Sequence, residues 1–200
     1  MTSAIQIAIR SQIQASIAVK QAVLENQQII SQIEVLANIC LSALRTGGKI
    51  IFAGNGGSFA DAQHLSAEFT SRFLFDRAPL ASLALGTNNS AISGIGNDYG
   101  YEQVFARELS GIAKLGDVFI PISTSGNSPS ILAAAKVSKD LSIATLALTG
   151  ASGGQLKLMC DNICIPSNDT ARIQECHIMV GHILCGLVEK IYFSERIRNE

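Results

Sequence analysis

The sequence predicts an α/β protein, a three-layer αβα sandwich around a five-stranded parallel sheet, with additional helices at its N-terminus. From residue 47 onward, short β-branched or apolar runs alternate with helical stretches, and Gly, Asp, Asn or Ser bounds each run. This alternation is typical of βαβ units, whose parallel sheet is covered by helices on both faces. Residues 3–45 differ, because they contain no Gly and no Pro and their apolar residues recur at helical spacing.

The composition indicates one globular domain that is poor in charge. The 200 residues are 48% hydrophobic and 16% charged, whereas a typical domain is roughly 25% charged. The formal net charge of −1 argues against nucleic-acid binding, which needs a basic excess. No apolar run approaches the roughly 18 residues that span a bilayer, so we expect no membrane partner. We expect the low content of charged residues to reflect burial in a core or in a subunit interface.

Residues 1–46 are interpreted as a helical oligomerisation segment, ahead of a single structural unit at 47–200. Ile5, Ile9, Ile13 and Ile17 follow helical spacing, and a break near 26–27 separates a second helix. The other faces of these helices carry Gln and Ser more than Lys and Glu. Such faces tolerate burial against a partner better than charged ones, so we expect the two helices to form subunit contacts.

The second unit is expected to be one doubly wound domain without repeats or linkers. The expected strands are 49–53, 81–85, 118–123, 143–148 and 162–166. The expected helices are 58–73, 101–113, 128–140, 152–160 and about 169–194.

The five cysteines are scattered and include no CxxC pair, so neither a zinc ribbon nor a thioredoxin-type motif is indicated. We interpret them as small buried hydrophobic residues in a reducing compartment. The N-terminus has no signal-peptide pattern, and a cytoplasmic location is therefore expected.

Two loops that follow predicted strands have the chemistry of a ligand site, which in open α/β sheets lies at the carboxyl ends of the strands. The Gly-rich loop, 54–58, reads GNGGS and precedes a helix, so its backbone can approach a ligand closely. It matches neither GxGxxG nor a Walker loop, which disfavours a dinucleotide or nucleoside triphosphate.

The hydroxyl loop, 123–128, reads STSGNS and offers four hydroxyls without any Lys or Arg. Ser128 followed by Pro129 is a good helix N-cap, but a cap needs only one hydroxyl. Several neutral donors at a helix N-terminus suit a phosphate dianion. The loop therefore favours a small, releasable sugar phosphate as ligand.

His64 and Glu68 lie four residues apart on the helix that follows the Gly-rich loop, and so share one face. The last helix carries Gln174, His177 and His182. Structural histidines are an equally good interpretation of this pattern. If the residues form a site, two histidines, a carboxylate and an amide oxygen suit a metal, zinc above all. The alternative is acid–base catalysis by Glu and His.

Several separated motifs together resemble the phosphoheptose isomerase family of the SIS (sugar isomerase) domain superfamily. They read GNGGSFADAQHLSAEFTSRF at 54–73, IGNDYGYEQVFARE at 95–108, GDVFIPISTSGNSPSIL at 116–132, LTGASGGQL at 148–156 and DTARIQECHIMVGHILC at 169–185. The resemblance covers nearly the whole chain and implies a flavodoxin-like SIS fold. It implies an aldose–ketose isomerase that converts sedoheptulose 7-phosphate to D-glycero-D-manno-heptose 7-phosphate through a cis-enediol, the first step toward nucleotide-activated heptose for lipopolysaccharide.

The resemblance also assigns site residues. It implies a catalytic pair, Glu68 and His182, and one zinc per subunit held by His64, Glu68, Gln174 and His182. It implies a homotetramer with active sites at subunit interfaces. The implied substrate-binding residues are Asn55, Gly56, Gly57, Ser58, Glu68, Asn97, Asp98, Ser123, Thr124, Ser125, Ser128 and Gln174. His177 matches no role and is interpreted as structural.

Spacing adds one expectation about the implied zinc ligands. Gln174 and His182 are eight residues apart, which on a straight helix means about 12 Å of rise and about 80° of rotation. We therefore expect these two ligands to come from different subunits, or the helix to bend near Gly181.

Three other functions stay open. A related SIS protein binds the bacterial replication initiator DnaA without catalysis and shares the fold, but it lacks counterparts of Glu68 and His182. The chain could instead isomerise another phosphosugar, or serve as a regulatory sugar-phosphate sensor, although it lacks a DNA-binding segment.

Overall fold

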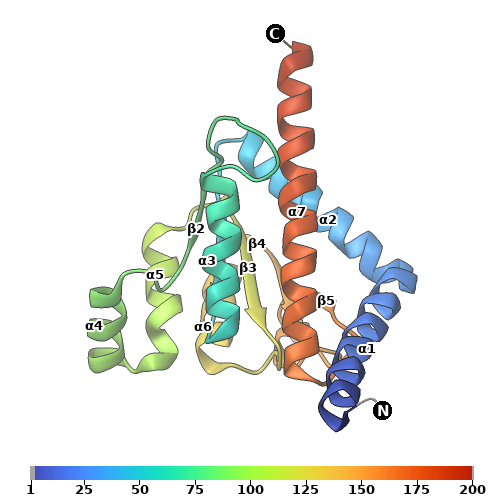
Figure 1. Ribbon diagram of the computed structural model, residues 1–200. Helices are drawn as coiled ribbons and strands as arrows, with labels where there is room; N and C mark the ends of the chain where they lie inside the picture. Colours follow the sequence, from blue (N-terminus) through green and yellow to red (C-terminus); the bar gives the residue numbers. More distant parts are fainter. Residues whose placement is uncertain (1–2, 200) are drawn as a thin grey trace.

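The sheet has five parallel strands, as the sequence predicts. The computed structural model describes residues 3–199, with side chains as far as residue 194. The strands are β1 (Ile50–Gly54), β2 (Ser82–Ala84), β3 (Val118–Ser123), β4 (Ala144–Thr149) and β5 (Asp161–Cys164). Their order is β2-β1-β3-β4-β5, and every neighbouring pair is parallel (Figure 1). The chain adds β2 on one side of β1 and then β3, β4 and β5 on the other side. The junction between β1 and β3 is therefore the switch point where such folds bind ligands.

Helices cover both faces of the sheet and form two cores. They are α3 (Gly57–Thr70), α4 (Asn89–Tyr99), α5 (Val104–Ile112), α6 (Pro129–Asp140) and α7 (Thr170–Asn199). Ile50 and Phe52 of β1 face the core shared with α3 and α7, while Ile51 and Ala53 face the core shared with α5 and α6. The alternation follows from the two-residue period of a strand. Because both faces are covered, β1 and β3 are apolar along their length and buried.

The N-terminal segment is two helices, α1 (Ala4–Glu25) and α2 (Gln27–Arg45), with the break where the sequence places it. Asn26 ends α1 and caps α2, since its side-chain oxygen accepts hydrogen bonds from the backbone N–H groups of Gln28 (3.0 Å) and Ile29 (3.2 Å). α2 packs into the core with α3 and α7. In α1 only Val23 is buried, so the unpartnered apolar surface of the segment lies mainly on α1.

Two parts of the second unit differ from the sequence prediction. The helix expected at 152–160 is a single 3-10 turn, Gln155–Leu158, because Gly153 and Gly154 both adopt positive φ (72° and 54°), which no right-handed helix accommodates. Helix α4 was not expected. Its two glycines lower helix propensity, but the cap at Asn88, which accepts from the N–H groups of Ser90 and Ala91, was a usable signal.

The last helix is longer and more apolar than expected. Its segment Thr170–Ser194 contains an 18-residue window with a mean hydropathy of 1.3, enough by length and composition to cross a membrane. In this structure α7 packs lengthwise on α2 and α3, and Cys176, Val180, Leu184 and Val188 are buried in that core. α7 is therefore a core helix of this structure.

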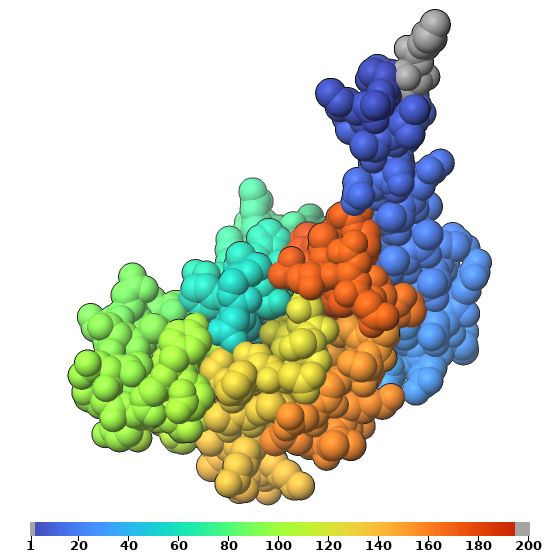
Figure 2. Space-filling model, turned by 90° about the horizontal axis from the view of Figure 1, so that it is seen from below, coloured from blue at the N-terminus to red at the C-terminus, as the bar shows by residue number. Residues whose placement is uncertain are grey.

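The carboxyl ends of the strands, and the helix N-termini that follow them, gather at one end of the molecule. Figure 2 views this end: the cyan α3 lies beside the orange-red α7, and the dark blue α1 projects from the body. The buried positions of Cys40, Cys176 and Cys185 agree with their interpretation as hydrophobic residues, whereas Cys160 and Cys164 are half-buried.

Candidate active site

Asn55 joins the two ligand loops, which follow the neighbouring strands β1 and β3. Its side-chain Nδ2 donates hydrogen bonds to the hydroxyls of Ser128 (2.8 Å) and Ser130 (2.9 Å). Its Oδ1 accepts one from the hydroxyl of Tyr101 (2.9 Å). The Gly-rich loop and the hydroxyl loop therefore form one site. Tyr101 and Ser130 are members that the sequence prediction missed, although both lie within the quoted motifs.

The hydroxyl loop leaves a helix N-terminus available to a ligand. Ser128 is the N-cap of α6 and Pro129 its first residue, as the sequence predicts. Yet the Ser128 hydroxyl makes no capping hydrogen bond and accepts from Asn55 instead. Pro129 has no N–H, and the N–H groups of Ile131 (3.1 Å) and Leu132 (2.9 Å) donate to the carbonyl oxygen of Ser128. The start of α6 still carries the positive end of the helix dipole.

The predicted hydroxyls differ in exposure. Ser125 is exposed, Thr124 and Ser128 are half-buried, and Ser58 and Ser123 are buried. The hydroxyl of Ser125 accepts from the backbone N–H of Asn127 (3.1 Å). Thr124, Ser125 and Ser128 are therefore the hydroxyls best placed to meet a ligand from solvent.

A small cavity of about 160 Å³ lies beside the Gly-rich loop. It is lined by Gly54, Asn55, Gly56, Phe59, Gly86, Asn89, Ile92, Tyr101 and Phe105. Gly56 has φ of +56°, a conformation that L side chains rarely adopt, so this turn requires glycine. The turn carries the chain from β1 into α3 and exposes the loop backbone at the cavity.

His64, Glu68 and His182 converge where α3 and α7 pack together. Nε2 of His64 lies 2.8 Å from Nε2 of His182 and 3.3 Å from a carboxylate oxygen of Glu68. The helices approach closely because residue 181 is a glycine, and a Cβ there would overlap the buried side chain of Leu65. His64 and Glu68, which the sequence places on one helix face, are thus joined by His182, a residue more than a hundred positions away.

The donor set of this cluster fits a divalent metal. One ligand atom from each of the three residues lies within 4.8 Å of the others. Tetrahedral zinc with bonds of about 2.0–2.1 Å to nitrogen sets its ligand atoms about 3.3 Å apart. Two imidazoles and a carboxylate are also ligands that zinc accepts, and three protein ligands with an open fourth position are typical of catalytic sites.

Gln174, near the start of α7, lies apart from that cluster and beside the first residue of α3. A Cβ at Gly57 would overlap its side-chain amide, so Gln174 lies directly against Gly57. His64 follows Gly57 by seven residues, about 10 Å along α3. α7 is one continuous helix from Thr170 to Asn199. Gln174 as a fourth metal ligand, supplied by another subunit, stays a prediction.

Asn97 and Asp98 lie near the end of α4, and both are exposed. The Asn97 amide donates to the Asp98 carboxylate (2.8 Å). None of the hydrogen bonds between described residues connects either side chain to the two ligand loops. Their assignment to the substrate site therefore stays a prediction as well.

Two further ionisable groups lie on the helices that form this cluster, Asp61 half-buried on α3 and His177 buried on α7. Burial raises the pKa of Asp61, which lies on α3 three residues before His64, and the charge of His64 opposes this shift. One carboxylate oxygen of Asp61 has no hydrogen-bond partner among the described residues. His177 is fully buried, and its Nε2 donates to the carbonyl oxygen of Thr149 (3.1 Å). Burial lowers the pKa of His177 to about 4, and this hydrogen bond opposes the shift.

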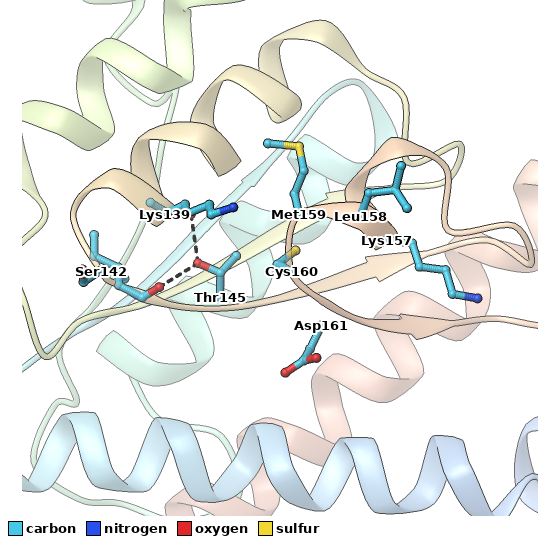
Figure 3. A pocket seen from close by; sticks show the side chains of 10 residues that line it. Lys139, Ser142, Thr145, Lys157, Leu158, Met159, Cys160 and Asp161 are labelled. Carbon is cyan, nitrogen blue, oxygen red and sulfur yellow. Dashed lines mark hydrogen bonds between the residues drawn. The ribbon is translucent and has the colours of Figure 1, made fainter.

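A larger hollow, about 540 Å³, lies far from this chemistry. Figure 3 shows its lining, which comes from the end of α6, the 3-10 turn at Gln155–Leu158 with the residues after it, and the starts of β4 and β5. It includes Lys139, Ser142, Thr145, Lys157 and Asp161. It therefore opens at the amino ends of the strands, opposite to the two ligand loops.

The chain is similar to known proteins over nearly its whole length. The SIS domain family matches residues 13–150. A phosphoheptose isomerase from Aneurinibacillus thermoaerophilus is 50% identical over 189 residues, which cover 94% of this chain and 96% of that protein. One from Sulfurimonas denitrificans is 47% identical over 190 residues, covering 94% and 97%. The structure of phosphoheptose isomerase from Neisseria gonorrhoeae superposes with a TM-score of 0.87 at 37% identity, covering 93% of this chain and 99% of that one.

Proposed function

The chain belongs to the phosphoheptose isomerase family of SIS-domain proteins and is a sugar-phosphate isomerase that acts on sedoheptulose 7-phosphate, and we propose that Glu68 and His182 carry out the reaction. The product is D-glycero-D-manno-heptose 7-phosphate, from which nucleotide-activated heptose for lipopolysaccharide is made. The observation that carries the proposal is the convergence of His64, Glu68 and His182 within 4.8 Å, where α3, which begins at the Gly-rich loop, packs against α7.

The isomerisation moves one hydrogen between two neighbouring carbons. Glu68 takes a proton from C1 of the ketose while His182 donates a proton to the oxygen on C2, which gives a cis-enediol. Glu68 then returns a proton to C2, and His182 recovers one from the oxygen on C1, which leaves the aldose. Both residues end in their starting states. Glu68 is suited to this role because its side chain is 21% exposed, so a sugar can reach a carboxylate that is partly shielded from water.

The two loops bind the substrate in this proposal. The N-terminal end of α6 and the hydroxyls of Thr124, Ser125 and Ser128 hold the phosphate, while Asn55, Gly56 and Gly57 contact the sugar chain. No Lys or Arg lies in either loop, so the helix dipole supplies the positive potential. Neutral donors also allow the product to leave.

His64, Glu68 and His182 would hold a zinc ion, with Gln174 of a second copy as a fourth ligand. Zinc bound there would polarise the substrate carbonyl. A carboxylate that serves as a metal ligand is less available as a base, so the two roles of Glu68 compete.

We further propose that the chain is a cytoplasmic homotetramer with sites at subunit interfaces. Five isoleucines of α1 are more than half exposed: Ile5, Ile7, Ile9, Ile13 and Ile17. An apolar groove of about 360 Å³ continues this surface between α1, α2 and α7. The oligomeric state, measured by light scattering for wild type and for I13E/I17E, tests this proposal, and a monomeric wild type would refute it.

The reaction itself is tested by following sedoheptulose 7-phosphate with NMR, using the protein as purified, after chelation and after zinc is restored. We expect conversion that falls on chelation and returns with zinc. Conversion that is unaffected by removal of all measurable metal would exclude zinc from the reaction. No conversion under any condition would exclude the enzyme assignment.

A parallel assay with fructose 6-phosphate and ribulose 5-phosphate tests whether another phosphosugar is the true substrate. We expect kcat/KM to be highest for sedoheptulose 7-phosphate. A higher value for either of the other sugars would reassign the substrate but keep the reaction class.

A further inference from the structure

We propose that Arg77 and Glu189, a buried ion pair outside the substrate site, are positioning residues that hold Glu68 and His182 in their catalytic geometry. The inference rests on the catalytic roles proposed above. The pair is almost inaccessible, with 2% of the Arg77 side chain and none of the Glu189 side chain exposed. Their charged atoms lie 2.8 Å apart.

Arg77 fixes the backbone at Glu68. Its guanidinium donates to the carbonyl oxygen of Glu68 (2.7 Å) and to those of Phe69 and Ser71 (2.7 Å each). Glu68 and Phe69 lie in the last turn of α3, where carbonyl groups have no helical partner. A planar guanidinium can reach several carbonyls and a carboxylate at once. The end of α3 that carries Glu68 is therefore tied to one buried side chain.

Glu189 fixes the loop that touches His182. Its carboxylate accepts from the backbone N–H groups of Phe73 (3.0 Å) and Leu74 (2.7 Å), in addition to Arg77. The ring of Phe73 stacks on the imidazole of His182, with centroids 5.5 Å apart and planes 15° from parallel. Glu189 thus sets the loop backbone, the backbone sets the Phe73 ring, and the ring limits the orientation of His182.

Stability alone is a weak reason for this arrangement. Replacing a buried ion pair by apolar residues of similar size is often neutral or stabilising, whereas breaking it by removing one partner is costly. The hydrogen bonds of this pair lead to the backbone of one proposed catalytic residue and to the ring packed on the other. A displacement of about 1 Å at a reacting group can lower a rate about 100-fold, so such contacts matter to the reaction.

The chain contains a matched control pair just before strands β1 and β3. Asp117 also lies buried, accepts from two backbone N–H groups, those of Lys49 and Lys114 (2.9 Å each), and pairs with the Lys49 ammonium (2.6 Å). Asp117 directly precedes β3 and Lys49 directly precedes β1. This pair has the same construction but contacts no proposed site residue.

The test compares R77M/E189L with K49M/D117L in steady-state assays on sedoheptulose 7-phosphate, with folding checked by circular dichroism and thermal melting. We expect both variants to fold. R77M/E189L is expected to lose about 10- to 100-fold in kcat with KM within about threefold of wild type, while K49M/D117L keeps both values.

Unchanged kcat in a folded R77M/E189L would overturn the proposal, as would an equal loss of kcat in K49M/D117L. If R77M/E189L does not fold, F73L decides, since it keeps the ion pair and removes only the ring on His182. We expect F73L to lose about 3- to 10-fold in kcat, and wild-type kcat would refute the inference. Wild type assayed in parallel separates the proposed isomerase function from the positioning role of Arg77 and Glu189, because an inactive wild type refutes the enzyme assignment itself.

Discussion

The two ends of the sheet differ in chemistry although the same strands and helices build both. The amino end has the larger hollow, about 540 Å³, with Lys139, Lys157 and Asp161 in its lining. The carboxyl end has a cavity of about 160 Å³, but also the helix N-termini and the Asn55–Ser128 hydrogen bond. In a parallel α/β sheet every βα connection leaves a helix N-terminus at the carboxyl end. Chain direction, rather than the size of a hollow, therefore decides where an anion can be bound without cationic side chains.

The largest expected effect contrasts Glu68, in the cluster with His64 and His182, with Asp161, in the amino-end hollow. Glu68→Gln removes the proposed base while keeping the size of the side chain, and we expect kcat to fall by about 10²–10⁴-fold. Asp161→Asn, in the amino-end hollow, is the matched change and should leave kcat unchanged. Steady-state assays on both variants measure the contrast. Comparable losses in both, or normal turnover by Glu68→Gln, would remove the basis for assigning catalysis to the cluster of His64, Glu68 and His182.

The second prediction concerns stability in acid. The three histidines of the chain all lie on α3 or α7, and His177 is the buried one. Burial lowers the pKa of His177 from 6.5 to about 4. The unfolded chain then binds this proton more readily than the folded one, so stability is lost as pH falls from about 6.5 to about 4, by about 3 kcal/mol in total.

His177→Gln tests this assignment. Its free energy of unfolding, from urea titrations at several pH values, should fall less steeply than that of wild type across the same window. A variant whose stability follows the wild-type curve in parallel would show that His177 does not titrate as described.

The smallest expected effect concerns substrate binding. Ser128→Ala removes one acceptor of the Asn55 amide and one hydroxyl of the proposed phosphate site. A hydrogen bond is worth about 1 kcal/mol, so we expect KM to rise about five- to tenfold with kcat little changed. Lys139→Gln is the amino-end control. If Lys139→Gln raised KM more than Ser128→Ala did, the substrate phosphate would be assigned to the wrong end of the sheet.

The regular elements were largely predictable from the sequence because each has a local cause. Val118–Ser123 is an uninterrupted β-branched and apolar run, and it is β3 with the predicted bounds. The prediction of a helix at 152–160 was wrong because two consecutive glycines adopt a backbone conformation that apolar spacing does not reveal. Helix α4 was missed because its glycines mask a signal that lies in one capping residue, Asn88.

By itself the sequence determined the αβα architecture, the two ligand loops and the shared face of His64 and Glu68, since each depends on residues close together in the chain. Only the tertiary structure brought His182 to 2.8 Å from His64 and joined the two loops through Asn55. It also revealed the Arg77–Glu189 pair, whose partners are separated by 112 positions. The contact between His64 and His182 depends on how closely α3 and α7 pack at Gly181. That distance is set by the shape of side chains on two helices, which no local pattern encodes.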